Sequence, residues 1–244
     1  MEVLVVIPAR GGSKRLPGKN VRPLAGRSLL AWTAEAVAAA GLAERAVLST
    51  DDPAIAEEGR RCGLPVPFLR PAELATDNAP TVDTILHALE WCSAEQGRDP
   101  DAVMVLQPTS PLRGAGCIGA ALELLDTRRD VESIVAMTPL HLPPSALFLW
   151  GAEGHAQAVA PDDRRPVYMP NGALYLTRTE ALRTRRTLYA DPVLPLVMDS
   201  RRSVDIDTEA DWHLAEALLS AGLPPEPAET AGYAAISSSE PAAR

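Results

Sequence analysis

Short apolar runs alternate with amphipathic segments along the N-terminal two thirds of the chain, and this alternation limits the possible fold most strongly. The apolar runs predicted to be strands cover residues 2–8, 45–50, 66–69, 102–107 and 133–137. The segments predicted to be helices cover residues 29–41, 51–63, 80–97 and 116–129. Such alternation predicts an α/β fold with a doubly wound, mostly parallel sheet and right-handed crossovers.

Residues that favour helix ends flank the first two predicted helices. Ser28 precedes the first helix, and Asp51 or Asp52 precedes the second, which has Pro53 in its first turn. Ser and Asp side chains accept hydrogen bonds from the free amides at a helix start, so these residues are expected N-caps. Gly41 is expected to end the first helix.

The pattern changes between about residues 138 and 198. Short strand-like pieces interrupted by proline, such as 146–150 and 172–177, replace the alternation of strands and helices. We expect a small antiparallel lobe inserted into the α/β domain, with a surface suited to dimerisation.

The α/β pattern resumes after this lobe with a predicted strand at 203–207 and a helix at 208–222. One domain is therefore expected over residues 1–223. Residues 224–244 are rich in Pro, Ala and Ser and have little to bury, so we expect a disordered tail.

Composition argues against several classes of partner. The formal net charge of −9 disfavours nucleic acid, because binding to a phosphate backbone needs a broad basic surface. The first apolar run is too short to span a membrane and lacks the flanks of a secretory signal, so a cytoplasmic protein without a membrane partner is expected. The three cysteines are widely spaced and the four histidines lack paired spacing, so neither disulfides nor a histidine metal site is predicted.

The loop after the first predicted strand, residues 8–20, is here called the opening loop. It contains both lysines of the chain and two arginines, namely Arg10, Lys14, Arg15 and Lys19. Gly11 and Gly12 permit close approach of the backbone to a ligand, so we interpret the loop as an anion-binding site. Its spacing matches neither the GxxxxGK[ST] nor the GxGxxG pattern, and a solvated basic loop remains the alternative.

Two carboxylates, Asp205 and Asp207, end the predicted strand at 203–207. Strand alternation places them on one face, where two hard oxygen ligands can share a divalent cation. The alternative is that Asp207 or Thr208 caps the following helix. An anion site elsewhere at the same sheet edge favours the metal interpretation, because Mg²⁺ is usually held by one or two carboxylates together with substrate phosphates.

Two further loops follow predicted strands. The stretch LQPTSPLR, residues 106–113, presents Gln107 and other polar side chains in a turn stiffened by two prolines. Arg70 follows the short third strand. Ligands of open α/β sheets bind beyond the carboxyl ends of the strands, so both loops are candidate binding surfaces.

The order and spacing of six motifs resemble the acylneuraminate cytidylyltransferase family over roughly residues 1–222. These motifs are IPARGGSKRLPGKN, STDD, RPAELATDNAPTVD, LQPTSPLR, PNGALY and DIDTEAD. The resemblance implies a nucleotide-diphospho-sugar-transferase-like fold, usually a homodimer. It also implies a reaction in which CTP and an acidic acceptor give a CMP conjugate and pyrophosphate, with Mg²⁺ as cofactor and without a nucleophilic side chain.

The resemblance also implies roles for individual residues. The expected catalytic residues are Arg10, Lys19, Asp205 and Asp207, with Asp205 and Asp207 holding the metal. The expected nucleotide-binding residues are Ala9, Arg10, Gly11, Gly12, Lys14 and Lys19 for the phosphates, Asn20 for the ribose, and Arg70 and Thr81 for the cytidine. The expected acceptor-binding residues are Gln107, His141, Arg164, Arg165, Asn171 and Tyr175.

The chain departs from the family pattern on the acceptor side. Relatives acting on nine-carbon sugar acids tend to carry a basic residue, often lysine, after the fifth strand, whereas this chain offers only His141 there. Arg164 and Arg165 precede the PNGALY motif in an altered context. The resemblance implies a nonulosonic, sialic-type acid as the expected acceptor, and these departures leave a non-sugar phosphonate or carboxylate as the alternative. A non-catalytic nucleotide-binding protein and a transferase for UTP or ATP are also compatible with the sequence.

Overall fold

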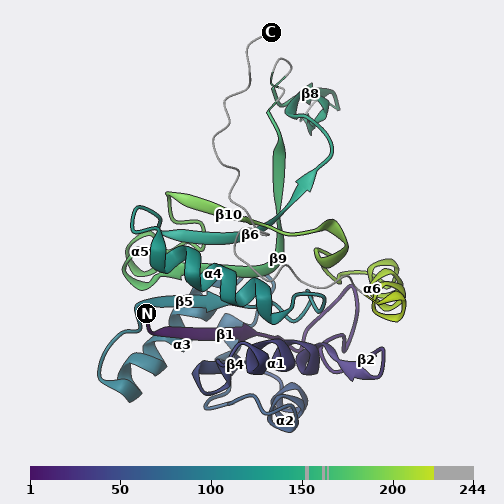
Figure 1. Ribbon diagram of the computed structural model, residues 1–244. Coiled ribbons are helices and arrows are strands. Elements are labelled where there is room, and N and C mark those ends of the chain that lie inside the picture. The colour runs from purple at the N-terminus through teal and green to yellow at the C-terminus, as the bar shows by residue number, and fades with distance from the viewer. Residues whose placement is uncertain (152–153, 161–162, 164, 223–244) are drawn as a thin grey trace.

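A six-stranded sheet forms the centre of the protein in the computed structural model, which describes residues 1–151, 154–160, 163 and 165–222 (Figure 1). Its strands, in spatial order, are β10 (Val193–Val197), β6 (Ser133–Leu140), β9 (Val167–Arg178), β5 (Ala102–Val105), β1 (Val3–Pro8) and β4 (Ala46–Ser49). β9 runs antiparallel to both neighbours, whereas the other adjacent strands pair in parallel. The prediction of a mostly parallel α/β sheet is confirmed.

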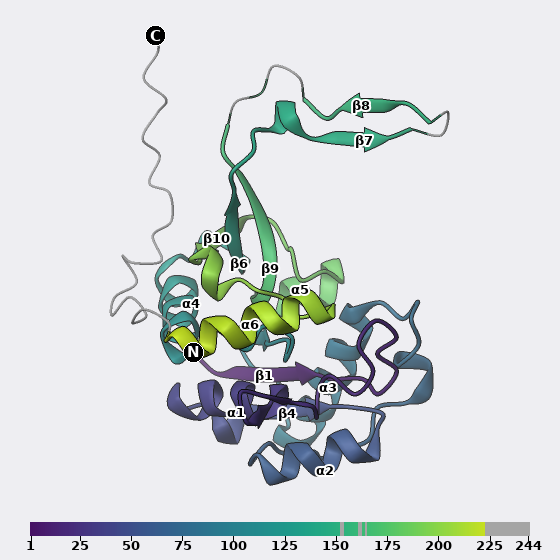
Figure 2. The same ribbon diagram turned by 90° about the vertical axis from the view of Figure 1, so that its right-hand side faces the viewer.

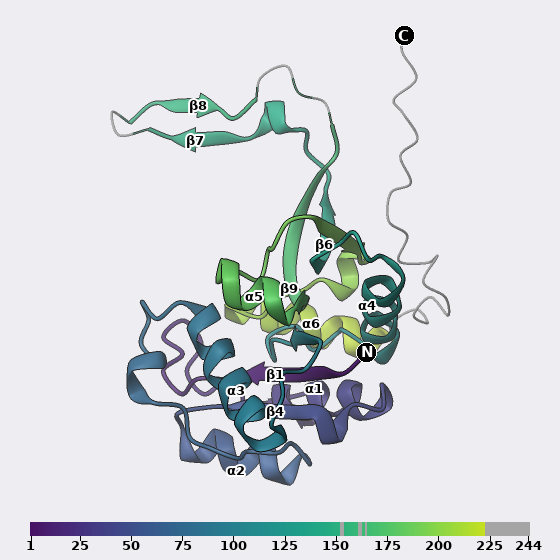
Figure 3. The same cartoon turned by 90° about the vertical axis from the view of Figure 1, so that its left-hand side faces the viewer.

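Helices cover both faces of the sheet (Figures 2 and 3). Those that bury apolar side chains on one face are α1 (Leu29–Ala39), α2 (Pro53–Arg61) and α4 (Ala115–Thr127). Those on the other face are α3 (Thr81–Gln96) and α5 (Thr179–Arg185). A third apolar cluster joins α6 (Glu209–Ala221) to the hairpin of β2 (Pro23–Leu24) and β3 (Arg27–Ser28). Single turns of 3₁₀ helix occur at Ala43–Arg45, Ala72–Leu74, Pro144–Ala146 and Ser200–Arg202.

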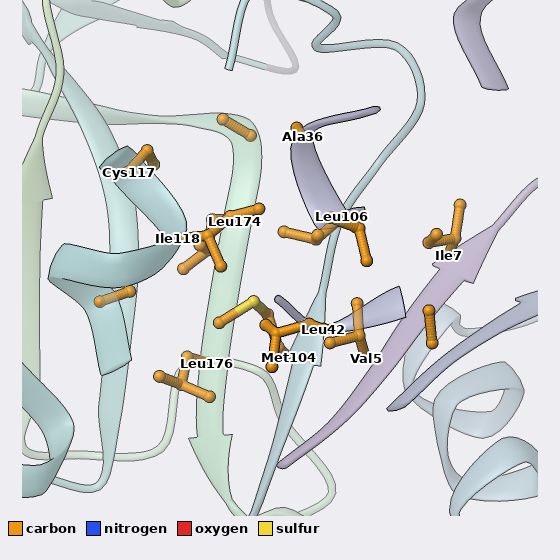
Figure 4. Close-up of a cluster of buried hydrophobic side chains, with 14 of the residues drawn as sticks. Val5, Ile7, Ala36, Leu42, Met104, Leu106, Cys117, Ile118, Leu174 and Leu176 are labelled. Carbon is orange, nitrogen blue, oxygen red and sulfur yellow. The ribbon is translucent and has the colours of Figure 1, made fainter. Parts of the chain in front are cut away.

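The strands are continuously apolar because both faces of the sheet are covered. In β1, Val5 and Ile7 point into the cluster beneath α1 and α4, and Leu4 and Val6 point into the cluster beneath α3. Figure 4 shows Val5 and Ile7 beside other buried side chains of the first cluster. Full burial of each such side chain stabilises the fold by about 1.5–3 kcal/mol. This packing fixes the carboxyl end of β1, from which the opening loop starts.

The expected caps are found at both helices. The Ser28 hydroxyl accepts a hydrogen bond from the Ala31 amide at 3.1 Å and starts α1. Of the two candidates for α2, Asp52 is the N-cap, since its carboxylate accepts from the amides of Ala54 and Ile55. Asp51 does not cap α2, so its carboxylate is available to contact the opening loop.

Two predicted strands are wrong. Residues 66–69 run beside β4 without forming a strand, because the prolines at 65 and 67 lack amide donors and only isolated hydrogen bonds form nearby. Residues 203–207 are also not a strand. The Ile206 amide donates to the Thr109 carbonyl at 2.8 Å, and the Asp207 amide donates at 3.1 Å to Asp211 in the first turn of α6.

A small antiparallel lobe projects from the domain (Figure 2). The ends of β6 and β9 continue beyond the sheet as a pair and carry the hairpin of β7 (Phe148–Trp150) and β8 (Ala156–Ala158). The predicted antiparallel pairing is therefore present, but β9, α5 and β10, which also lie within residues 138–198, belong to the main domain. The predicted tail, residues 224–244, lies outside the described residues.

The described helices include none that is long and apolar enough to cross a membrane.

Candidate active site

A cavity of about 430 Å³ opens at the carboxyl ends of β1 and β5. Ten residues expected from the sequence to bind ligand line it: Ala9, Arg10, Lys14, Lys19, Asn20, Arg70, Thr81, Gln107, Asp205 and Asp207. Five cationic and three acidic side chains contribute to its wall, so cations are in excess by two although the whole chain carries a net charge of −9. This local excess suits an anionic ligand.

Lys19 is held deep in the opening loop, with its side chain only 12% exposed. Its ammonium group donates to the Ile206 carbonyl at 2.7 Å and to Asp207 Oδ1 at 2.9 Å. Arg15 contacts the other oxygen of Asp207 at 2.9 Å. Lys19 therefore joins the opening loop to the segment that carries both candidate metal ligands.

Asp77 also lines the cavity, although no contact with the opening loop was predicted for it. It lies in the loop before α3 and pairs with Arg10 at 2.8 Å and with Lys14 at 2.5 Å. The hydrogen bond from Lys14 is the main reason why the pKa of Asp77 is lowered, and Arg10 acts in the same direction. All four cations of the opening loop thus contact a carboxylate, either Asp77 or Asp207.

Gly11 and Gly12, which were expected to bind phosphate, do not line the cavity. The Gly11 amide donates to Asp51 Oδ1 at 3.2 Å, and a Cβ atom at Gly11 would lie 2.5 Å from Asp52 Oδ2. Gly11 therefore permits the opening loop to pack against the start of α2. Gly12 has open space around its Cα, since a Cβ atom there would have no neighbour within 4 Å.

Asn20 and Arg70 are buried polar side chains at the cavity wall. Asn20 Nδ2 donates to the Arg10 carbonyl at 3.2 Å and so holds the opening loop in its curve. The Arg70 guanidinium donates to the Ser49 hydroxyl at 3.2 Å and to the Ser49 carbonyl. Burial lowers the pKa of Arg70 to about 10, with Asp51 opposing the effect, so the side chain stays charged at neutral pH. Thr81 at the start of α3 faces the same part of the cavity.

Asp205 and Asp207 both reach the cavity. Burial raises the pKa of Asp205, the neighbouring charge of Asp207 raises it further, and a hydrogen bond with Thr109 opposes both. A divalent cation would relieve this repulsion, and the two carboxylates are the hard oxygen donors that Mg²⁺ prefers. Among the described residues, no group of three His, Cys, Asp or Glu side chains comes together, so substrate phosphates and water would complete the coordination.

The expected acceptor residues are spread over two regions. Gln107 lines the cavity, whereas Asn171 and Tyr175 lie in β9 behind it. Asn171 is buried and donates to Ser203 Oγ at 2.9 Å. Tyr175 packs against Tyr189 with ring centroids 5.5 Å apart, and burial is the main cause of its raised pKa.

The remaining expected acceptor residues lie away from this cavity. His141 follows β6 at the base of the lobe, and the exposed Arg165 pairs with Asp163 at 2.6 Å. Neither lines the cavity. Arg164 lies outside the described residues.

The fold and the site together define a class. An α/β sheet that ends in a cation-rich cavity, with two carboxylates beside a lysine, has the parts needed for nucleotidyl transfer. The sequence profile described as cytidylyltransferase matches residues 4–139. The chain belongs to the acylneuraminate cytidylyltransferase family.

Individual relatives support this assignment. The chain is 36% identical over 229 residues to a CMP-N,N'-diacetyllegionaminic acid synthase of Legionella pneumophila, covering 90% of this chain and 97% of that protein. It is 30% identical to an N-acylneuraminate cytidylyltransferase of Escherichia coli, covering 88% of this chain but only 51% of that protein. A solved CMP:2-keto-3-deoxy-manno-octonic acid synthetase in complex with CTP shares the fold, with a TM-score of 0.65, 16% identity, and coverage of 91% of this chain and all of that one.

Proposed function

We propose that this protein transfers the cytidylyl group of CTP to a nonulosonic, sialic-type sugar acid. An acceptor hydroxyl loses its proton to water as its oxygen forms a bond to the α-phosphorus, the bond between that phosphorus and the bridging oxygen breaks, and pyrophosphate leaves. The single observation that carries the proposal is the cavity that gathers the opening-loop cations, Arg70, Gln107 and two carboxylates at one sheet edge. The named activities of the relatives supply the nucleotide and the acceptor class.

The charges of the cavity match the main difficulty of this reaction. An acid must approach an anionic triphosphate, so the barrier is dominated by charge repulsion, and cations and in-line positioning are the effective catalysts. Arg10 and Lys14 would bind the phosphates after exchanging their carboxylate partner Asp77, and Lys19 would bind them while held by Asp207. Asn20 would contact the ribose, and Arg70 and Thr81 would contact the cytidine.

Asp205 and Asp207 would hold Mg²⁺, which supplies charge stabilisation at the phosphates when it is bound. The Lys19 ammonium, which already contacts Asp207 at 2.9 Å, would lie next to that metal and could contact phosphate oxygens. Gln107 would face the acceptor. Asn171 and Tyr175 would support the acceptor side from β9, and His141, Arg164 and Arg165 would reach an acceptor only through the lobe.

The lobe is also our candidate dimer surface. Phe148, Leu149 and Trp150 in β7 are 61%, 63% and 82% exposed, and Leu142 and Met169 elsewhere in the lobe are also exposed. Apolar side chains gathered in this way on a projecting hairpin are typical of an interaction surface. We propose a homodimer formed through this lobe, and sedimentation of wild type and Trp150→Glu tests it.

The activity is tested by incubating the protein with CTP, Mg²⁺ and a panel of acids while pyrophosphate release is measured. The panel contains N,N'-diacetyllegionaminate, N-acetylneuraminate, 2-keto-3-deoxy-manno-octonate and a small phosphonate. We expect a nonulosonic acid to release pyrophosphate and Asp205→Asn and Asp207→Asn to abolish the release. Turnover of the phosphonate alone would change the acceptor class, and CTP binding without turnover of any acid would indicate a non-catalytic protein.

Titration calorimetry with the four nucleoside triphosphates tests the nucleotide. The phosphate-binding part of the site contacts groups common to all four, so discrimination must come from the wall that carries Arg70 and Thr81. Preferential binding of CTP is expected. Tighter binding of UTP or ATP would refute the assignment of the base.

A further inference from the structure

β9 contains a marked irregularity where it passes the cavity. Val135 of β6 pairs with Tyr175, but Met137, two residues further along β6, pairs with Pro170, five residues away along β9. Over this stretch β9 therefore contains three more residues than β6, and they lie between Pro170 and Tyr175. Bulges of this kind redirect the chain and are frequent beside active sites.

Gly172 lies inside this bulge with a φ of +75°. A Cβ atom at this position would lie 2.7 Å from Gln107 Oε1, 3.3 Å from Ser110 Oγ and 3.5 Å from Asp205 Oδ2. Both the backbone conformation and the close approach to Gln107 require glycine. A side chain at residue 172 would thus contact Gln107 and Asp205, the second of which is a candidate metal ligand.

Buried polar side chains tie the bulge to the loops that carry these two residues. Arg113, which is 2% exposed, donates to the Ala173 carbonyl at 2.7 Å and to the Gln107 carbonyl at 3.2 Å. Ser110 Oγ donates to the Asn171 carbonyl at 3.3 Å. Fully buried hydrogen-bonded networks of this type hold their members in one arrangement.

On the other side, the bulge is joined to the segment that leads to Asp205. Asn171 Nδ2 donates to Ser203 Oγ at 2.9 Å, and the Ile206 amide donates to the Thr109 carbonyl at 2.8 Å. The Gln107 loop, the bulge and the Asp205 segment therefore form one connected unit.

We propose that Gly172 is a positioning residue that sets the placement of the Gln107 side chain relative to Asp205, and through it the placement of the acceptor relative to the metal-bound nucleotide. This inference rests on the proposed function for its catalytic consequence. A methyl group at residue 172 must push the Gln107 amide away, because the backbone on the other side is held by Arg113. A displacement of about 1 Å at a reacting group typically reduces the rate by about 10²-fold.

The first test is Gly172→Ala, with Gly119→Ala in α4 as the matched control, because nothing lies within 4 Å of a Cβ atom at Gly119. With N,N'-diacetyllegionaminate as the acid, we expect kcat/KM for the acid to fall about 10²-fold in Gly172→Ala. The dissociation constant of CTP with Mg²⁺ should stay within about twofold, and Gly119→Ala should behave as wild type. An equal loss of CTP affinity would indicate general disruption and overturn the proposal.

The second test is a double-mutant cycle that combines Gly172→Ala with Gln107→Ala. If Gly172 acts through Gln107, removing the Gln107 amide removes the clash, and Gly172→Ala should reduce kcat/KM by less than about threefold in that background. If the two substitutions reduce kcat/KM independently, so that their effects multiply in the double variant, Gly172 does not act through Gln107 and the proposal is overturned.

A third measurement does not depend on turnover. The side-chain amide NMR signals of Gln107 should shift in Gly172→Ala and stay unchanged in Gly119→Ala. If wild type turns over no acid, the proposed function fails, while the Gln107 signals still decide the positioning role. Unchanged Gln107 signals would overturn it.

Discussion

Replacing Arg70 with methionine should separate folding from nucleotide binding. The difference between the ordinary Arg pKa of 12.5 and about 10 corresponds to roughly 3 kcal/mol by which the surroundings of Arg70, burial above all, disfavour the charged form. Loss of the charge removes this penalty. The Ser49 carbonyl keeps a donor, the Ala9 amide at 3.0 Å, so mainly the buried Ser49 hydroxyl loses its partner, at about 1–3 kcal/mol. The two effects nearly cancel, and the flexible Met side chain fills the space.

We therefore expect the free energy of unfolding of Arg70→Met to lie within about 1 kcal/mol of wild type, equivalent to a change in Tm of about 2–4 °C for a chain of this size. The affinity for CTP should fall about 10- to 150-fold, which corresponds to the loss of one hydrogen bond to a charged group. Urea denaturation and titration calorimetry measure the two quantities. Arg27→Met, which removes an exposed arginine paired with Glu35, is the control. Destabilisation beyond about 3 kcal/mol would refute the reasoning, since it would make Arg70 a structural ion-pair residue.

Three further predictions concern charged side chains. Lys19→Met should lower kcat/KM for CTP about 10²-fold, as expected for one lost transition-state contact, and an unchanged kcat/KM would contradict the role of Lys19 in phosphate binding. Asp77→Asn should instead tighten CTP binding about two- to fivefold at low salt, because it frees Arg10 and Lys14 from exposed ion pairs that are individually weak. Weaker CTP binding in calorimetry would show that Asp77 organises the opening loop. Asp99→Asn should lower Tm at pH 7. Arg183 lowers the pKa of Asp99 in the folded state, so the ionised Asp99 carboxylate stabilises the fold. This stabilisation is present above the unfolded-state pKa of about 4 and is lost as the pH falls through the lower folded-state pKa. The Tm values of the variant and wild type should therefore converge in acid.

The parts of the fold that could be predicted from the sequence are those set by local signals. The Ser28 cap and the continuously apolar β1 depend on neighbouring residues, and both are present in the structure. The strand predicted at 66–69 is absent from the structure. The prediction relied on the apolar side chains there and gave too little weight to two prolines, which lack amide donors. The place of β9 between β5 and β6 depends on pairing between residues that are 27 to 76 positions apart, which no local pattern encodes.

The candidate site shows the same division. Residues at predicted strand ends, such as Lys19 and Gln107, meet at one cavity because parallel strands end at one sheet edge. Asp77 was missed as a partner of the opening loop, since an exposed ion pair between distant loops leaves no periodic signal. The role of Gly172 was also missed, although the Asn-Gly dipeptide at 171–172 is a signal for a positive φ in the chain.

Burial distinguishes the two lysines of the opening loop. Lys14 is 80% exposed and Lys19 is 12% exposed, so water screens the first charge far more than the second. Lys14 therefore suits the capture of an incoming anion, and its partner Asp77 is released into solvent at small cost. Lys19 is bound to Asp207 and to the Ile206 carbonyl, so its charge is already oriented before a ligand arrives and needs little reorganisation during reaction. We therefore expect the exposed lysine to act on binding and the buried one on the chemical step, so that Asp77→Asn tightens CTP binding whereas Lys19→Met lowers kcat/KM for CTP.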